Sequence, residues 1–314
     1  MAYNPIGGNN ASTTGASSNA DQRDLFVKKF STDVMRYFMD TNVMKALITN
    51  KTIDAGKSEA FPIVGNATAA SVANDAAELA VQNLKTTERE IVIGDLTVAH
   101  AWLTDLDKAM AHYDSQSAQA ESIGRALAKK VDKDILLKVI EAGAVVDGPS
   151  ATSAGLRTFG DDIFTDEISG TMTTGQGVYT ACLDAVTEEK EKDTVGDSVF
   201  VFRPSQYFLL LNNPAQTGLT WVNDPSVQSG KVPQLLGKRV YMSPHFPDLV
   251  GATIATGEVA GVLFSKESVG CLELMSISTR IDYIPQRLSN LIVGKMAVGY
   301  GILNHGCAIN IKQV

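Results

Sequence analysis

The chain opens with a polar stretch that is followed by a periodic apolar pattern. Residues 1–20 are mainly Gly, Ser, Thr, Asn and Ala, and Tyr3 and Ile6 are their bulky apolar side chains. Burying these two side chains alone does not offset the conformational entropy that the segment loses when it becomes ordered. We therefore expect an arm that orders only against a partner. After Asp21, apolar side chains recur every three or four residues, which predicts an amphipathic helix ending near Asp40. These side chains are Leu25, Phe26, Phe30, Val34, Tyr37 and Phe38.

Two later segments alternate with the two-residue period of strands. Residues 58–64 place bulky side chains at Phe61 and Ile63, and residues 86–93 alternate in the same way. The roughly twenty residues between them are small, polar or alanine, too poor in large apolar groups to form a core. We therefore predict a long two-stranded hairpin that projects from the body. Because isolated hairpins are only marginally stable in water, it needs a surface to lie on, and a second copy of the chain can supply it.

A four-residue spacing of apolar side chains marks residues 105–142. It predicts one long helix, with Asp105 and Asp107 near the positive end of the helix dipole and Gly143 as a natural stop. At ~1.5 Å per residue the helix would be about 55 Å long, which exceeds the width of a compact small domain. We therefore expect a spine and not an ordinary core helix. The positions that step by four are Ile123, Leu127, Val131, Ile135 and Val139.

Shorter helices and strands alternate in the C-terminal half. Residues 147–177 and 213–232 are rich in loop-forming residues, while helices predicted at 178–192 and 204–212 flank a buried strand at 199–202. Together with the earlier segments, this order predicts an α+β protein. Further strands are predicted at 238–242, 259–264, 269–275, 279–284, 291–298 and 308–311.

Composition and charge exclude several classes of function. Apolar residues make up 44% of the chain and charged residues 20%, and no run approaches the ~20 apolar residues of a membrane-spanning helix. The N-terminal residues lack the basic and apolar regions of a secretory signal. A net charge of −8 argues against direct recognition of nucleic acid. It remains compatible with a container for nucleic acid, because an acidic wall does not hold packaged DNA by attraction.

Candidate catalytic and binding motifs fail on their neighbours. Gly56-Lys57-Ser58 lacks the glycine that a phosphate-binding loop needs five positions earlier, where Lys51 stands, and Pro62 disfavours the required helix. The four histidines are isolated from one another, and the three cysteines are widely spaced, which is typical of buried, reduced thiols. We therefore expect no cofactor, no metal and no catalytic residue. The histidines are His100, His112, His245 and His305, and the cysteines are Cys182, Cys271 and Cys307.

Four segments in order resemble the major capsid proteins of tailed bacteriophages, of the T-seven-like podophage kind. The order and spacing of these segments also match over nearly the whole chain. The resemblance implies the HK97-like fold of phage and herpesvirus shells. It is carried by residues 25–38 (LFVKKFSTDVMRYF), 54–70 (DAGKSEAFPIVGNATAA), 107–128 (DKAMAHYDSQSAQAESIGRALA) and 291–311 (LIVGKMAVGYGILNHGCAINI).

The resemblance implies five segments with distinct roles. An N-terminal arm with the amphipathic helix would cover residues 1–53, and an extended β-hairpin loop that overlies a neighbour would cover 54–94. A peripheral domain with the spine helix would cover 95–174, and an axial α/β domain 175–285. Residues 286–314 would return to the peripheral domain.

The function implied is self-assembly into an icosahedral virion capsid in the host cytoplasm. Pentamers and hexamers would enclose double-stranded DNA without sequence-specific binding, with a scaffolding protein and a portal protein as partners. We predict apolar anchors and charged residues that set the register between subunits. The apolar anchors are Phe26, Phe30, Phe61 and Ile63, and the charged residues are Lys57, Glu59, Glu88 and Arg89.

Two alternatives remain open at this point. An encapsulin-type nanocompartment shell shares the fold, although the serine-rich leader and the order of segments argue against it. A soluble enzyme, for instance a hydrolase using His100 or His112 with a nearby carboxylate, would belong to a different class. We do not expect an enzyme, because no pair of catalytic groups has a recognisable spacing.

Overall fold

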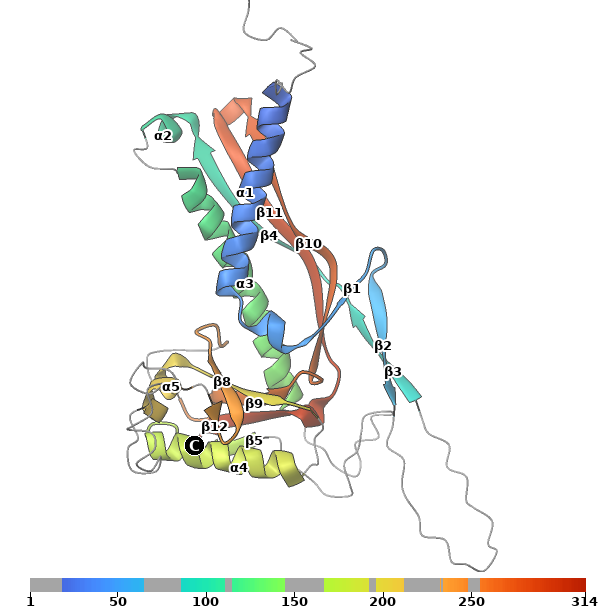
Figure 1. Cartoon of the computed structure of the whole chain (residues 1–314), viewed down its shortest axis with the longest axis vertical. Coiled ribbons are helices and arrows are strands. Elements are labelled where there is room, and N and C mark those ends of the chain that lie inside the picture. Colours follow the sequence, from blue (N-terminus) through green and yellow to red (C-terminus); the bar gives the residue numbers. More distant parts are fainter. Residues whose placement is uncertain are drawn as a thin grey trace, which may run out of the picture. The chain divides into compact units, whose positions relative to one another are not determined.

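The computed structural model describes eight stretches of the 314-residue chain, and contacts divide the chain into two discontinuous units. One unit comprises residues 1–42, 95–130 and 275–297, and the other comprises 43–94, 131–274 and 298–314. We call them the first unit and the second unit. Three elements, α3, β10 and β11, have residues in both (Figure 1). The described residues are 19–64, 86–110, 115–144, 167–191, 196–211, 232, 234–247 and 255–314.

In the first unit, helices pack on a strand pair. Strand β4 (Leu96–Thr104) pairs antiparallel with β11 (Ser289–Ile302). Helices α1 (Asn19–Thr41) and α3 (Ser115–Ala142) lie side by side, because a Cβ added at Gly124 would meet the Val34 carbonyl oxygen at 2.7 Å (Figure 1). A Cβ at Gly294 of β11 would meet Ile123 of α3 at 2.7 Å. Two glycines therefore permit close packing of α3 on both α1 and the strand pair.

Side-chain contacts close one end of this strand pair. A 3-10 turn, Pro285–Arg287, precedes β11, and the Arg287 guanidinium carbon lies 5.0 Å from the centre of the Trp102 ring. Helix α2 (Asp105–Met110) begins directly after β4, and the Tyr283 hydroxyl donates a hydrogen bond of 2.9 Å to the Asp105 carboxylate. These contacts hold the beginning of α2 against the end of β4 and β11.

In the second unit, a six-stranded sheet packs against two helices. The strand order is β5-β12-β9-β6-β8-β7, with parallel and antiparallel neighbours. Helices α4 (Gly175–Glu191) and α5 (Pro204–Leu211) bury apolar side chains against it, and the stacked rings of Phe200 and Phe202 lie 5.4 Å apart. The strands are β5 (Glu167–Gly170), β6 (Ser198–Phe202), β7 (Gln234–Leu235), β8 (Lys238–Met242), β9 (Val259–Ser265) and β12 (Ala308–Gln313).

The remaining strands of the second unit lead to a separate hairpin. Strand β1 (Thr49–Thr52) pairs parallel with β10 (Val269–Ile284), and the four-stranded sheet has the order β1-β10-β11-β4. Strands β2 (Ser58–Val64) and β3 (Thr86–Val92) form their own two-stranded antiparallel sheet. Residues 65–85 between them lie outside the described part of the chain.

Most predicted elements are confirmed. The amphipathic helix is α1, with Phe30, Val34 and Phe38 buried, and the two predicted hairpin strands are β2 and β3. None of the described helices is long and apolar enough to span a membrane. The mixed α/β content also agrees with the predicted class.

Three predictions of extent need correction. Residues 105–142 are described as two helices, α2 and α3, with 111–114 outside the description, and α3 with 28 residues is about 42 Å long. The strands predicted at 269–275 and 279–284 are one strand, β10. Residues 286–314 do not stay together, because β11 pairs with β4 whereas β12 pairs with β5 and β9 of the six-stranded sheet.

A buried carboxylate joins three parts of the second unit. The side chain of Asp132 in α3 is fully buried and accepts hydrogen bonds from the backbone amides of Val43 and Met44, at 3.2 and 3.1 Å. Its Oδ2 also lies 3.2 Å from Nδ1 of His245. Burial raises the pKa of Asp132, while the amides and His245 act in the opposite direction. Asp132 therefore fixes the chain where the 3-10 helix Met44–Leu47 begins.

We predict that Asp132→Ala destabilises the protein more than a surface change on the same helix does. The substitution leaves the buried Met44 amide, the partly buried Val43 amide and His245 without their acceptor, which should lower the free energy of unfolding by roughly 2–4 kcal/mol. Chemical denaturation with Lys133→Ala, an exposed neighbour, as the control measures the difference. Equal stability of the two variants would contradict the assigned role of Asp132.

Candidate assembly surfaces

The β2–β3 hairpin begins at a short, hydrogen-bonded root. The register runs from Ser58 opposite Val92 to Val64 opposite Thr86. Beyond the last pair, the Ile93 amide donates a hydrogen bond of 2.8 Å to the Lys57 carbonyl oxygen. Successive side chains of each strand point to opposite faces of the hairpin. The hairpin therefore has two distinct faces, beginning at its root.

Three glycines form the surface on which the root of β3 packs. A Cβ at Gly299 would lie 2.8 Å from the Val92 carbonyl oxygen, and one at Gly301 would lie 2.7 Å from the Ile91 side chain. A Cβ at Gly270 would also meet Ile91, at 2.9 Å. We call Gly270, Gly299 and Gly301 the glycine patch. Because the patch has no side chains, β3 approaches the backbone of β10 and β11 closely, and Ile91 is only 2% exposed.

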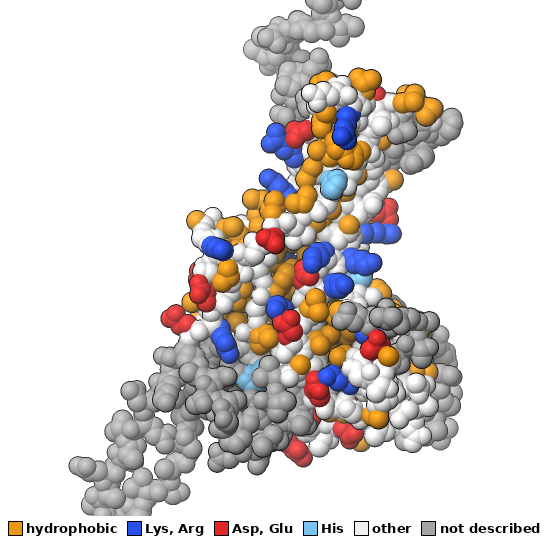
Figure 2. Space-filling view, turned by 180° about the vertical axis from the view of Figure 1, so that it is seen from behind, with side chains coloured by type: hydrophobic (Ala, Val, Ile, Leu, Met, Phe, Trp, Pro, Cys, Tyr) orange, Lys and Arg blue, Asp and Glu red, His pale blue; other side chains and the backbone are white. Residues whose placement is uncertain are grey.

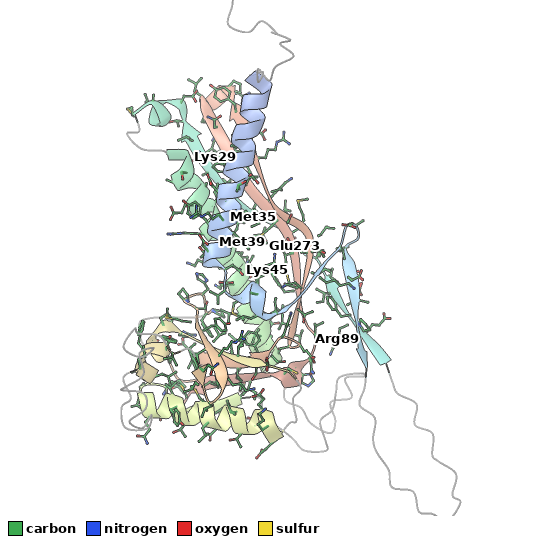
Figure 3. All side chains as sticks on the ribbon, viewed as in Figure 1. Lys29, Met35, Met39, Lys45, Arg89 and Glu273 are labelled. Carbon is green, nitrogen blue, oxygen red and sulfur yellow. The ribbon has the colours of Figure 1, made fainter. Side chains whose placement is uncertain are left out.

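Ion pairs reinforce the same root. The Lys51 ammonium in β1 lies 2.6 Å from the Glu59 carboxylate in β2 and 5.3 Å from the centre of the Phe61 ring. Lys45 and Glu273 form a second pair at 2.8 Å, with side chains 27% and 15% exposed. In Figure 3 these two residues are labelled together on the body of the second unit. Partly exposed pairs of this kind contribute modestly to stability, but they orient the strand that leads into β2.

Charged residues of the hairpin next to the docked root are exposed. Lys57, Glu88, Arg89 and Glu90 are exposed, and Arg89 of β3 lies opposite Phe61 of β2 in the register (Figure 3). Phe61 is partly buried. Ile91 of β3 and Ile93, which directly follows β3, are buried. The described part of the hairpin therefore combines a docked root with charged, exposed residues beside it.

The structure brings together five of the eight residues predicted to contact a neighbour. Lys57, Glu59, Phe61, Glu88 and Arg89 all lie on the described part of the hairpin. Of the other three, Phe30 of α1 packs inside its own subunit with 4% exposure. Phe26 lies on α1 and Ile63 on β2, and their side chains lie outside the described part of the chain. Contact with a neighbour stays a prediction for every one of them.

Sequence reasoning missed the glycine patch and its partner, Ile91. The motif Gly299-Tyr300-Gly301 lies within a strand, where glycine often marks a close approach of another backbone, so a signal was present. Asp132 was also missed, because it stands among charged residues of a helix and nothing local distinguishes it from them.

Pairing and burial account for the state of the buried titratable groups Glu189 and Cys271. Lys238 and Glu189 pair at 3.0 Å beside a cavity of about 10 Å³, room for about one water molecule. Burial raises the pKa of Cys271 to about 12 and keeps the thiol protonated. No group of three or more His, Cys, Asp or Glu side chains arranged to hold a metal occurs in the described ranges. In Figure 2, acidic and basic side chains are interspersed on the visible face.

We predict that Gly299→Val releases the root of β3. The new side chain would collide with backbone atoms of Val92 and Ile93, which a rotamer change cannot relieve, so the overpacking should cost about 1–3 kcal/mol. Amides of residues 88–93 should exchange with deuterium faster. The control is Gly94→Val, because nothing lies within 4 Å of a Cβ at Gly94. Unchanged exchange in the Gly299 variant would contradict the docked geometry.

Comparisons with known proteins agree with this architecture. The major capsid protein of Escherichia phage T7 is 24% identical over an alignment of 317 positions that covers 91% of each chain. The capsid structure of cyanophage P-SCSP1u has a TM-score of 0.69 at 25% identity and covers 87% of this chain and 88% of that one. The mature capsid of bacteriophage PhiM1 has a TM-score of 0.67 at 14% identity over 87% of both chains, a likeness of fold. The fold is HK97-like.

A family model described as "Gp10A-like: Major capsid protein" matches residues 60–312, which is most of the chain. The match extends over both units and includes β3, α3, the six-stranded sheet and the glycine patch. It confirms the resemblance drawn from the four sequence segments and the expectation of a structural protein without enzymatic activity. The chain belongs to the Gp10A-like family of major capsid proteins.

Proposed function

We propose that the β2–β3 hairpin ties copies of this major capsid protein together in the icosahedral shell of a tailed phage. The observation that carries this proposal is the combination of a docked root with exposed charges on the same hairpin. Its root is buried on the glycine patch of its own subunit, whereas Lys57, Glu88 and Arg89 are turned to solvent. A hairpin of two strands gains stability from a surface to pack on, and a neighbouring subunit supplies one in a shell.

The five-segment organisation supports the same mode of assembly. In this proposal residues 1–53 form an arm and 54–94 the extended loop, while 95–174 form the peripheral domain around α3. The axial domain, residues 175–285 with strand β12 added from the C-terminal segment, gathers into pentamers and hexamers. The six-stranded sheet with α4 and α5 supports an axial domain with a core of its own.

Individual contacts at such interfaces need only be weak. Exposed charges give register and specificity more than affinity, and an ion pair at the surface contributes about 0–1 kcal/mol. In a closed shell each subunit makes several contacts at once, so the effective concentration of partner surfaces is high. The hairpin therefore acts through repetition of modest contacts in many copies.

The proposed contents and partners of the shell are double-stranded DNA, a scaffolding protein and a portal protein. A net charge of −8 supports a wall that encloses DNA without binding particular sequences. The interspersed charges on the face in Figure 2 are compatible with that role.

We predict that deleting residues 66–85 abolishes shells while leaving a folded subunit. The deleted stretch lies between β2 and β3, and the core of the six-stranded sheet lies outside it. Analytical ultracentrifugation and electron microscopy measure assembly, and circular dichroism measures folding. The matched control replaces the same twenty or so positions by a Gly/Ser linker of equal length. Normal shells from the deletion variant would contradict the proposed tie.

A charge reversal tests the described part of the hairpin. Arg89→Glu should slow assembly and raise the concentration of subunit needed to form shells, because an exposed charge that sets register becomes repulsive. Lys266→Glu makes the same change of net charge at an exposed turn outside the hairpin. If both variants assemble like the unsubstituted chain in light scattering, Arg89 has no part in the contact.

A further inference from the structure

Helix α1 has a second apolar face that its own subunit leaves exposed. One face buries Phe30, Val34 and Phe38. Another face exposes Met35 and Met39, by 38% and 66% (Figure 3). A shallow groove of about 370 Å³ follows this face and is lined by Ser31, Thr32, Met35, Arg36, Met39 and Asp40. Exposed methionines are adaptable, polarisable groups that suit a surface able to pack against another helix.

Positively and negatively charged residues alternate along α1 beside the two methionines. Lys29, Asp33, Arg36 and Asp40 are separated by steps of four, three and four residues, which places them in one stripe along α1. The signs read plus, minus, plus, minus from the N-terminal to the C-terminal end. Arg36 and Asp40 are 75% and 66% exposed, and their side chains approach to only 4.0 Å. They are therefore available to a partner.

The order of charges on one α1 helix is complementary to the order on a second α1 helix that runs in the opposite direction. If two α1 helices run antiparallel, Lys29 lies opposite Asp40 and Asp33 lies opposite Arg36, once on each side of a two-fold axis. If they run parallel about an axis along the helices, the two stripes lie on opposite edges of the contact and do not face each other. Only the antiparallel arrangement pairs opposite charges, so the stripe favours it.

We propose that the occupant of this groove is α1 of a second copy of the chain, packed antiparallel about a two-fold axis near Met35. Such a contact is isologous, because the same patch serves both partners. Met35 of each copy lies near the axis, and Met39 packs beside Thr32 of the other copy. The inference rests on the proposed assembly into shells, since a contact of this size forms when other contacts hold the subunits close.

Single cysteines distinguish this arrangement from its alternatives. Met35→Cys should form disulfide-linked dimers on oxidation with diamide, whereas Met39→Cys and Thr32→Cys alone should form several-fold fewer. A mixture of Met39→Cys and Thr32→Cys subunits should crosslink efficiently. The natural cysteines Cys182, Cys271 and Cys307 are buried, so they give a low background.

Charge exchange provides an independent readout on the Met35→Cys background. Arg36→Glu places like charges opposite Asp33 and should reduce crosslinking several-fold. Adding Asp33→Arg restores opposite charges across the axis and should restore the yield. Circular dichroism of both variants controls for loss of α1 itself.

The outcomes separate this inference from the proposed shell function. Shells of Met35→Cys subunits that contain no crosslinked dimer would overturn the α1 pairing and leave the shell function standing. Equal self-crosslinking of Met39→Cys and Met35→Cys would also overturn it, because that is the result of a parallel contact. Failure of the unsubstituted chain to form particles would count against the shell function, and crosslinking is scored on whatever species the chain forms.

Discussion

The close approach of β3 to the glycine patch is the contact on which the position of the hairpin depends. Two strands alone hold too little apolar surface to fix their own direction. Gly270, Gly299 and Gly301 remove the side chains that would otherwise keep β3 away, and Ile91 fills the space they leave. The Lys51–Glu59 pair then orients β2 beside it. A subunit built in this way holds the exposed charges of its hairpin on a fixed root.

The same principle of close packing at small residues recurs in the first unit, where it determines which face of α1 is buried. Gly124 lets α3 approach the backbone of α1 near Val34, and Gly294 lets β11 approach α3. Because this packing uses the Phe30 face, Met35 and Met39 are left at the surface. Internal packing and the surfaces offered for assembly are thus two consequences of the same small residues.

Sequence periodicity predicted the elements whose apolar pattern is local. It failed for strands that depend on pairing with a distant segment. The four-residue spacing of α3 and the alternation in β2 and β3 were sufficient to find those elements. Strand β1, Thr49–Thr52, has no apolar residue and exists through its pairing with β10, which local propensity does not reveal. The place of β12 in the six-stranded sheet is non-local in the same sense. Strand β4 does alternate, with Leu96, Val98 and Trp102 exposed, so its pattern could have been recognised.

The candidate surface was predictable in part for the same reason. Lys57, Phe61 and Arg89 were found because they belong to recognisable strands, whereas the buried partners of the hairpin root come from segments some 200 residues later. The most direct test of the account is a reconstruction of the assembled shell by electron cryomicroscopy at side-chain resolution. We expect Ile91 of each copy to stay on its own glycine patch while Arg89 contacts a neighbouring copy. A hairpin that touches only its own subunit would contradict the account.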